Sequence, residues 1–297
     1  MKTGRAELFL FLVTLIWGAT FLFTKIGLQY TTPALYIVIR FSIALFFCLM
    51  FFGKNLLKID KQVTLNGIIL GLLFGAGFLL QTIGLKYTSV AKSAFITGIT
   101  VIFTPFVYWL IERKKINFWQ IGGVVIVTIG LWLFINPKFD NLNIGDMLTL
   151  FSTLFWAFYI TYMDVFTRGR SSKTETTQLV IFQLIAAAPI SILYCALFEL
   201  SNIKLVWSTG LLVSLAYNGI IASFLLTFIH TSVQRFTNPV KASLIFSLEP
   251  VFASILAVIF LKEIMYISEI TGAVILMAGV LLSKVGDFQF KGSFLNK

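Results

Sequence analysis

The sequence is poor in charged residues, histidine and cysteine. Asp, Glu, Lys and Arg make up 12% of its 297 residues, whereas a soluble domain carries about 25%. This shortage argues against a soluble enzyme and against a disordered chain. A single His and two Cys are too few for a tight transition-metal site. Neither the metalloprotease motif H-E-x-x-H nor the phosphate-binding motif G-x-x-x-x-G-K occurs, so we expect no metal, no cofactor and no ATP binding.

Basic residues outnumber acidic ones, yet they do not indicate a nucleic-acid partner. The net charge is +11, from 23 Lys and Arg against 12 Asp and Glu. A nucleic-acid footprint gathers its basic residues on one face or in one run, whereas these residues are dispersed along the chain. We therefore expect no nucleic acid among the partners.

Long hydrophobic runs dominate the sequence instead. Hydrophobic residues make up 58% of the chain and the mean hydropathy is +0.94. Ten runs approach the ~20 residues that a helix needs to cross a bilayer. The sequence therefore predicts an all-α polytopic membrane protein with ten transmembrane helices and the lipid bilayer as a partner. The expected spans are 8–28, 34–52, 64–84, 91–111, 118–135, 147–165, 177–198, 206–229, 240–261 and 266–283.

The distribution of Lys and Arg between the loops predicts the orientation. With the N-terminus inside, sixteen basic residues fall in inner segments, five in outer segments and two, Lys25 and Arg40, within spans. Short loops rich in Lys and Arg stay on the cytoplasmic side. We therefore expect a multi-pass protein of the cell (inner or plasma) membrane with both termini in the cytoplasm.

The two halves of the chain resemble one another. Q-T-I-G-L-K-Y-T-S-V-A-K from Gln81 aligns with H-T-S-V-Q-R-F-T-N-P-V-K from His230 at an offset of 149. Earlier in each half, Trp17 lies opposite Trp156, at an offset of 139. We expect a first five-helix repeat at 1–139, a second at 140–284 and a short cytoplasmic tail at 285–297. Because each repeat has an odd number of spans, the second repeat would enter the membrane from the opposite side and have inverted topology.

Inverted repeats are typical of secondary transporters, in which the two halves open one central site to either face in turn. The leading hypothesis is therefore a permease or exporter that moves a small metabolite by alternating access. A lipid-carrier translocator and a non-transporting membrane scaffold are the alternatives. An enzyme is not expected, because no acid–base pair or nucleophile constellation occurs at a common depth.

Three motifs carry a resemblance to a known family. They are W-G-A-T-F at Trp17, I-R-F at Arg40 and the run Q-R-F-T-N-P-V-K-A-S-L-I-F-S-L-E-P from Gln234. With these motifs the chain resembles the drug/metabolite transporter superfamily, in its ten-span EamA-like branch. The resemblance implies two inverted five-helix halves around a central cavity and the transport of small solutes such as amino acids. The first half departs from the pattern, because Thr100 stands where the second half has Glu249.

Glu249 is the main candidate for a functional side chain. It lies near mid-depth of the ninth span, where a carboxylate costs roughly 2.5–3.5 kcal/mol on insertion scales, so we expect it to face the bundle interior. Pro250 follows and has no amide hydrogen, which leaves the carbonyl of Phe246 without its helical partner. Glu249 would contact a substrate amine, couple transport to protons, or join neighbouring helices.

Other charged or titratable residues are candidates for gates. Lys92 and Lys241 begin the fourth and ninth spans at equivalent positions, where they would meet an anionic group or snorkel to the interface. Arg40 lies inside the second span and would pair with a carboxylate or snorkel outward. His230 and its equivalent Gln81 are expected at the inner and outer ends of their spans, as a proton shuttle or as hydrogen-bonded residues.

Aromatic and hydroxyl stripes are expected to line the central cavity. Trp17 and Trp156 lie toward the middle of their spans, whereas interfacial tryptophans prefer span ends. Tyr159 follows Trp156 at helical spacing, and Thr97 and Thr100 belong to a similar stripe on the fourth span. Small polar residues also serve helix packing within membranes, so a structural role is the alternative for these stripes.

Overall fold

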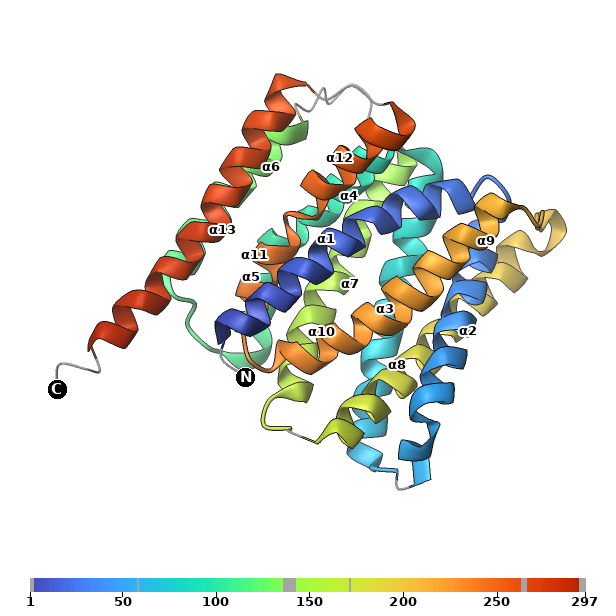
Figure 1. Cartoon of the computed structure of the whole chain (residues 1–297), viewed down its shortest axis with the longest axis horizontal. Coiled ribbons are helices and arrows are strands. Elements are labelled where there is room, and N and C mark those ends of the chain that lie inside the picture. The colour runs from blue at the N-terminus through green and yellow to red at the C-terminus, as the bar shows by residue number, and fades with distance from the viewer. Residues whose placement is uncertain (1–2, 58, 136–142, 171, 263–265, 294–297) are drawn as a thin grey trace.

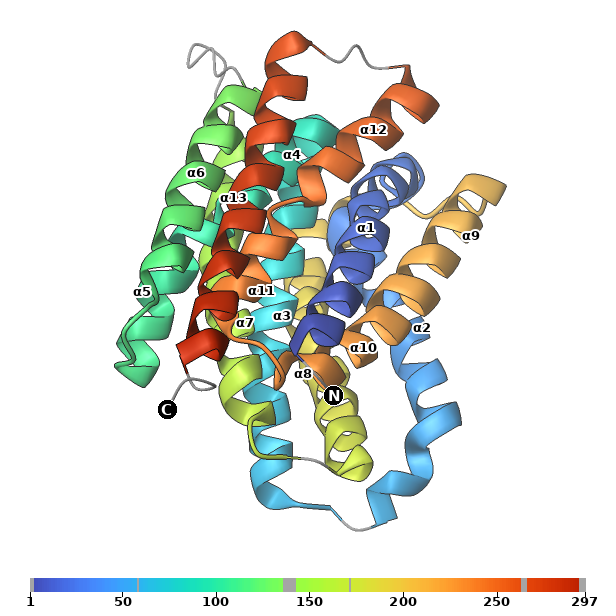
Figure 2. The ribbon, with the colours of Figure 1, turned by 60° about the vertical axis from the view of Figure 1, so that its left-hand side comes forward.

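The structure is a computed structural model that describes residues 3–57, 59–135, 143–170, 172–262 and 266–293. Within these ranges the regular elements are helices, apart from an isolated β-bridge between Thr31 and Leu205. Figures 1 and 2 show them as a bundle in which α1 begins and α13 ends at the same end of the molecule. We call this end the terminal end.

The first half supplies five spans, of which the fourth is broken. The second span continues into a short 3-10 turn at Gly53–Leu57. The helices are α1 (Thr3–Gly27), α2 (Pro33–Phe52), α3 (Lys61–Tyr87), the broken pair α4 (Val90–Gly98) and α5 (Thr100–Glu112), and α6 (Phe118–Ile135).

The second half repeats this order, with further interruptions. Its third span begins at Thr209, not at 206, and passes through a π-helical segment at Tyr217–Leu226. The helices are α7 (Ile144–Thr167), α8 (Lys173–Tyr194), α9 (Thr209–Ala216), α10 (Thr227–Gln234), the broken pair α11 (Pro239–Phe246) and α12 (Glu249–Leu261), and α13 (Ile267–Ser293).

The described helices are long and apolar enough for a multi-pass membrane protein. Eight continuous or broken helices qualify as membrane spans by length and composition, and two shorter apolar helices cover Phe118–Leu133 and Ile267–Ser283. Together they account for all ten predicted spans. The predicted all-helical polytopic fold is therefore confirmed.

Equivalent positions in the two halves have the same local structure. At the offset of 149, α4 and α11 begin at equivalent residues, and so do α5 and α12, and α6 and α13. The residues that end α5 and α12, Arg113 and Lys262, both adopt the left-handed conformation, with φ of 54° and 55°. α1 and α7 run in opposite directions, and α6 packs against α13 across the two halves (Figures 1 and 2).

The breaks within the fourth and ninth spans also coincide. The amide of Ile99 donates to the carbonyl of Ile96, and the amide of Leu248 donates to that of Ile245, both at 3.1 Å. Pro250 is in the first turn of α12, as expected from its missing amide hydrogen. The first half has Val101 at the equivalent position and breaks in the same way, so proline alone does not cause the break.

Candidate functional site: a pocket between the two halves

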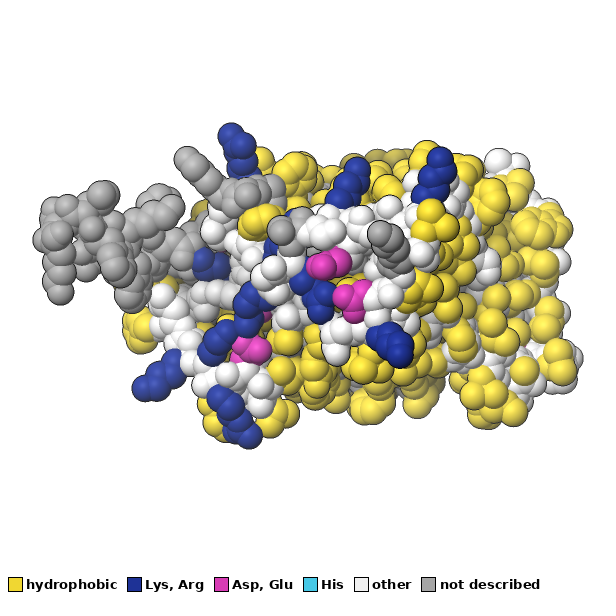
Figure 3. Space-filling view, turned by 90° about the horizontal axis from the view of Figure 1, so that it is seen from below, with side chains coloured by type: hydrophobic (Ala, Val, Ile, Leu, Met, Phe, Trp, Pro, Cys, Tyr) yellow, Lys and Arg dark blue, Asp and Glu magenta, His cyan; other side chains and the backbone are white. Residues whose placement is uncertain are grey.

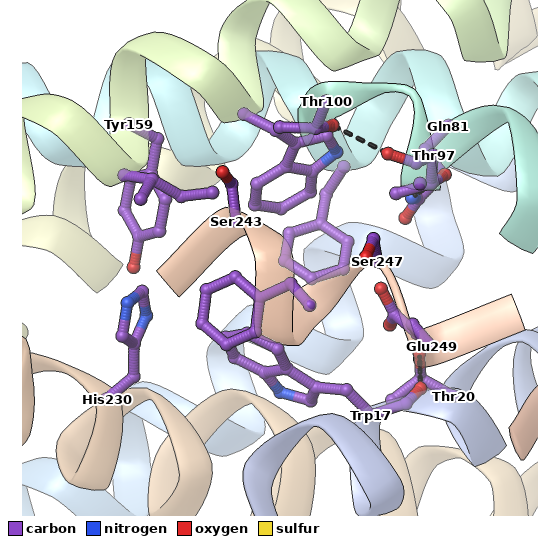
Figure 4. Close-up of a pocket in the computed structure, with 15 residues that line it drawn as sticks. Trp17, Thr20, Gln81, Thr97, Thr100, Tyr159, His230, Ser243, Ser247 and Glu249 are labelled. Atoms are coloured by element: carbon purple, nitrogen blue, oxygen red, sulfur yellow. Dashed lines mark hydrogen bonds between the residues drawn. The ribbon is translucent and has the colours of Figure 1, made fainter. Parts of the chain in front are cut away.

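A pocket lies at the centre of the bundle, beside both helix breaks. It contains about 600 Å³ of space between atoms, and Figure 4 shows side chains from both halves around it. All six residues predicted to line a cavity do line it, namely Trp17, Thr97, Thr100, Trp156, Tyr159 and Glu249. The other lining residues are Thr20, Phe78, Gln81, Gly98, Ile160, His230, Ser243, Phe246 and Ser247. That the six contact a solute stays a prediction.

The lining consists largely of equivalent positions from the two halves. Trp17 and Trp156 are one such pair, Gln81 and His230 a second, and Thr100 and Glu249 a third. The offset of 139 also pairs Thr20 with Tyr159, and the offset of 149 pairs Thr97 with Phe246 and Gly98 with Ser247. The pocket therefore lies where the two repeats meet, but its chemistry is asymmetric, because several pairs combine different side chains.

Glu249 gives the pocket its charge. It is the first residue of α12, and its carboxylate points into the space in Figure 4. Among the described residues it is the only charged one that lines the pocket, and its side chain has no ion pair there. Burying an unpaired carboxylate is costly. The positive end of the helix dipole at the start of α12 offsets only ~0.3–1 kcal/mol of that cost.

Aromatic rings form the walls of the pocket. Trp17 packs against Phe246 at 5.4 Å and against His230 at 5.5 Å between ring centroids. Trp156 packs edge-on against the ring of Phe78, with 4.8 Å between ring centroids. Trp17 also donates from Nε1 to the carbonyl of Ala222 at 3.3 Å, whereas Nε1 of Trp156 is buried and has no hydrogen-bond partner among the described residues.

The Tyr159 hydroxyl accepts from Gln183 Nε2 at 2.9 Å. The Ser and Thr hydroxyl groups of the pocket instead donate their hydrogens to helix carbonyls, so their oxygens are available to a solute only as acceptors. The bonds run from Thr20 to the carbonyl of Trp17 (2.7 Å), from Thr97 to Ser93 (2.9 Å), from Thr100 to Thr97 (2.6 Å), from Ser243 to Val240 (2.9 Å) and from Ser247 to Leu244 (2.6 Å).

His230 lies in the pocket, not at the end of its span. The expectation that His230 and Gln81 lie at opposite ends is wrong, because α3 and α10 continue past them to Tyr87 and Gln234. His230 Nε2 lies 3.0 Å from Gln234 Oε1, and Figure 4 shows the Tyr159 hydroxyl pointing toward the His230 ring. Nδ1 of His230 has no hydrogen-bond partner among the described residues.

Arg40 lies behind the pocket wall. Its guanidinium is 4.2 Å from the centroid of the Phe78 ring, and its Nε donates to Ser223 Oγ at 2.7 Å. The residue is 1% exposed, so it does not snorkel. The structure shows no ion pair between Arg40 and a carboxylate of the described residues. Both expectations for Arg40 are therefore wrong, because a hydroxyl and an aromatic face hold its charge.

Lys92 and Lys241 form ion pairs that join the two halves. Lys92, in the first turn of α4, lies 2.6 Å from Asp146 in the first turn of α7. Lys241, in the first turn of α11, lies 3.7 Å from Glu7, the fifth residue of α1. Neither lysine simply snorkels to the interface, because a carboxylate of the other half holds each one, and their role as gates stays a prediction. The sequence reasoning missed both carboxylates, although the offset of 139 that aligns Trp17 with Trp156 also aligns Glu7 with Asp146.

Comparison with known proteins identifies the family. The profile of the EamA-like transporter family matches residues 4–136 and 143–285. The chain belongs to the EamA-like transporter family. An uncharacterized transporter of Archaeoglobus fulgidus is 29% identical over 95% of this chain and 86% of its own length. The uncharacterized transporter YoaV of Bacillus subtilis is 25% identical over 91% of this chain and 94% of its own.

The fold of this EamA-like protein also occurs among solved structures. A crystal structure matches it with a TM-score of 0.74, over 98% of this chain and 99% of that one, at 16% identity. This match shows a shared fold alone. The family resemblance inferred from the motifs is confirmed, and the names of the family and of these relatives indicate a membrane transporter, not an enzyme.

Proposed function

We propose that this EamA-like protein is a secondary transporter, a permease or exporter of a small metabolite such as an amino acid or a related solute. The solute would bind in the central pocket and reach either face by alternating access. The main support is that equivalent residues of two repeats line one pocket, because two nearly equivalent packings of such repeats can open a shared site to opposite faces.

The two ion pairs are proposed as the gates. Lys92–Asp146 joins α4 to α7 at the end of the bundle away from the terminal end, and Lys241–Glu7 joins α11 to α1 near the terminal end. We propose residues 1–139 and 140–284 as the moving halves. Because each pair connects one half to the other, opening the pocket to one face separates one pair and leaves the other closed.

The proposed energy source is an ion gradient or the gradient of the solute itself, because the chain has no ATP-binding motif. Glu249 is the candidate for proton coupling, since it is the charged residue of the pocket. A proton that neutralises its carboxylate would remove the cost of burying an unpaired charge.

We propose that the terminal end faces the cytoplasm in the cell membrane. Figure 3 views this end, and Lys and Arg side chains gather on it. Basic residues in short loops favour the cytoplasmic side, so the surface supports the orientation expected from the loop counts.

Counterflow in proteoliposomes tests the proposed function. Vesicles loaded with an unlabelled solute should take up the same labelled solute for at least one member of a broad metabolite panel. Glu249→Gln should lower that exchange at least tenfold, because it removes the charge of the pocket. The matched control Glu175→Gln should leave it unchanged, since Glu175 lies 3.8 Å from Arg170, outside the pocket.

Two results would contradict the proposal. Exchange of no member of the panel would favour the non-transporting scaffold. Movement of a lipid-linked substrate alone would favour the lipid-carrier translocator.

A further inference from the structure

We infer that the central pocket selects protonated organic amines, meaning primary or secondary amines on an apolar or aromatic body without a carboxylate. This inference rests on the proposed function and narrows its range of small metabolites, because within that range it favours amines over zwitterionic amino acids. Three properties of the lining lead to it: its charge, its hydrogen-bonding groups and its aromatic walls.

The charge of the pocket favours a cation. Glu249 lines the pocket, and the lining contains neither Lys nor Arg among the described residues. Lys92 and Lys241 are held by carboxylates at the two ends. A monocation would supply the counter-charge that Glu249 lacks, whereas the carboxylate of a zwitterionic amino acid would meet no cation in the pocket. Buried charges in proteins are paired, so the amine fits and the zwitterion does not.

The hydroxyl groups favour a solute that donates hydrogen bonds. Thr20, Thr100, Ser243 and Ser247 have each donated their hydrogen to a helix carbonyl, so they accept bonds but do not offer them. An ammonium group is a pure donor and a carboxylate is a pure acceptor. The Ser and Thr hydroxyl groups thus match the ammonium group, whereas a carboxylate would depend on the few donors of the lining, such as Nε1 of Trp156.

The walls fit the apolar body of such an amine. Trp17 and Phe246 lie together at 5.4 Å between centroids, and Trp156 and Phe78 form a second group at 4.8 Å. Aromatic faces attract cations, with Trp the strongest, and they also bury apolar surface. The unpaired Nε1 of Trp156 would donate to a neutral oxygen on the solute, such as a hydroxyl or carbonyl.

A matched set of compounds on one skeleton tests the inference. Phenethylamine, phenylalanine, 2-phenylethanol and 3-phenylpropionate present a cation, a zwitterion, a neutral alcohol and an anion on similar bodies. Their binding to the purified full chain is measured by calorimetry at neutral pH. We expect the amine to bind at least tenfold more tightly than each of the others. Equal or tighter binding of phenylalanine or 3-phenylpropionate would overturn the inference.

Two variants locate the effect. Glu249→Gln should weaken binding of the amine at least tenfold and change binding of 2-phenylethanol less than twofold, which also reports that the variant is folded. Glu175→Gln, remote from the pocket, should change neither. The inference is overturned if Glu249→Gln leaves the affinity for the amine unchanged.

Counterflow separates this inference from the proposed function. Phenethylamine is used as the labelled solute, with protein-free vesicles as the baseline for its passive leak. Exchange of phenethylamine that Glu249→Gln abolishes supports both the amine selectivity and the transport function. Exchange of phenylalanine without exchange of phenethylamine overturns the amine selectivity but still supports the transport function. Amine binding that depends on Glu249, without exchange of any compound, supports the selectivity and contradicts transport.

Discussion

At the scale of single residues, the two tryptophans of the pocket occupy equivalent positions but have different surroundings. Trp17 donates its indole hydrogen to the carbonyl of Ala222, which joins α1 to the π-helical segment of the third span of the second half. Trp156 has no such bond among the described residues. The first tryptophan therefore has a structural role, and the second keeps a donor available for a solute.

This difference predicts different effects of the same substitution. Trp17→Phe should lower the free energy of unfolding by about 1 kcal/mol, because it removes the hydrogen bond to the carbonyl of Ala222. Trp156→Phe should leave the unfolding free energy within ~0.5 kcal/mol of the parent chain, because it removes a buried donor that has no partner among the described residues, and it should weaken solute binding. Denaturant titration and calorimetry of both variants measure the two quantities. Equal losses of stability in the two variants would contradict the distinction.

At the scale of helices, α3 and α8 approach at backbone contact. A Cβ atom added to Gly71 would lie 2.4 Å from the carbonyl oxygen of Gln183, and one added to Gly75 would lie 2.5 Å from that of Ala187. Small residues allow such close approach in membranes. These two helices, one from each half, therefore pack closely against one another.

Gly75→Ala tests this contact. The added methyl group must push the two backbones apart, so we expect a loss of about 1–3 kcal/mol in the free energy of unfolding, typical of overpacking. Gly122→Ala is the matched control within a helix, because its Cβ would meet its nearest neighbour at 3.5 Å. Its higher helix propensity should make the control neutral or stabilising. The unfolding temperatures of both variants are measured in detergent. An equal shift of the unfolding temperature in the two variants would contradict the close approach of α3 and α8.

Hydropathy and the internal offset predict much of the arrangement, because the length of an apolar run and the equivalence of two segments are local properties. These two patterns predict the ten spans and predict that Trp17, Trp156 and Glu249 line one cavity. The break after Gly98 was not predictable, since the apolar run continues through it and no proline marks it. The partner of Lys92 was missed because Asp146 lies on another helix, and only the packing of α4 against α7 brings them together.

At the scale of the whole molecule, the two ion pairs are equivalent but not equal. Asp146 also accepts hydrogen bonds from the hydroxyl of Thr88 at 2.8 Å and from the amide of Asn143 at 2.9 Å. Lys92 is therefore held by a carboxylate that its neighbours fix in place. The Lys241–Glu7 pair is longer, at 3.7 Å, and is more deeply buried. The gates proposed at the two ends thus differ in ion-pair distance and in exposure.

Crosslinking of the two gates tests alternating access most directly. Cysteines replace Lys92 and Asp146 in one protein and Lys241 and Glu7 in another, each in a chain that carries Cys48→Ala and Cys195→Ala, and a short reducible thiol crosslinker joins each pair. Either crosslink alone should abolish counterflow, because both gates must open once in every cycle, and reduction of the crosslinker should restore it. Full counterflow with either crosslink complete would contradict the proposal that solute passes between the two halves.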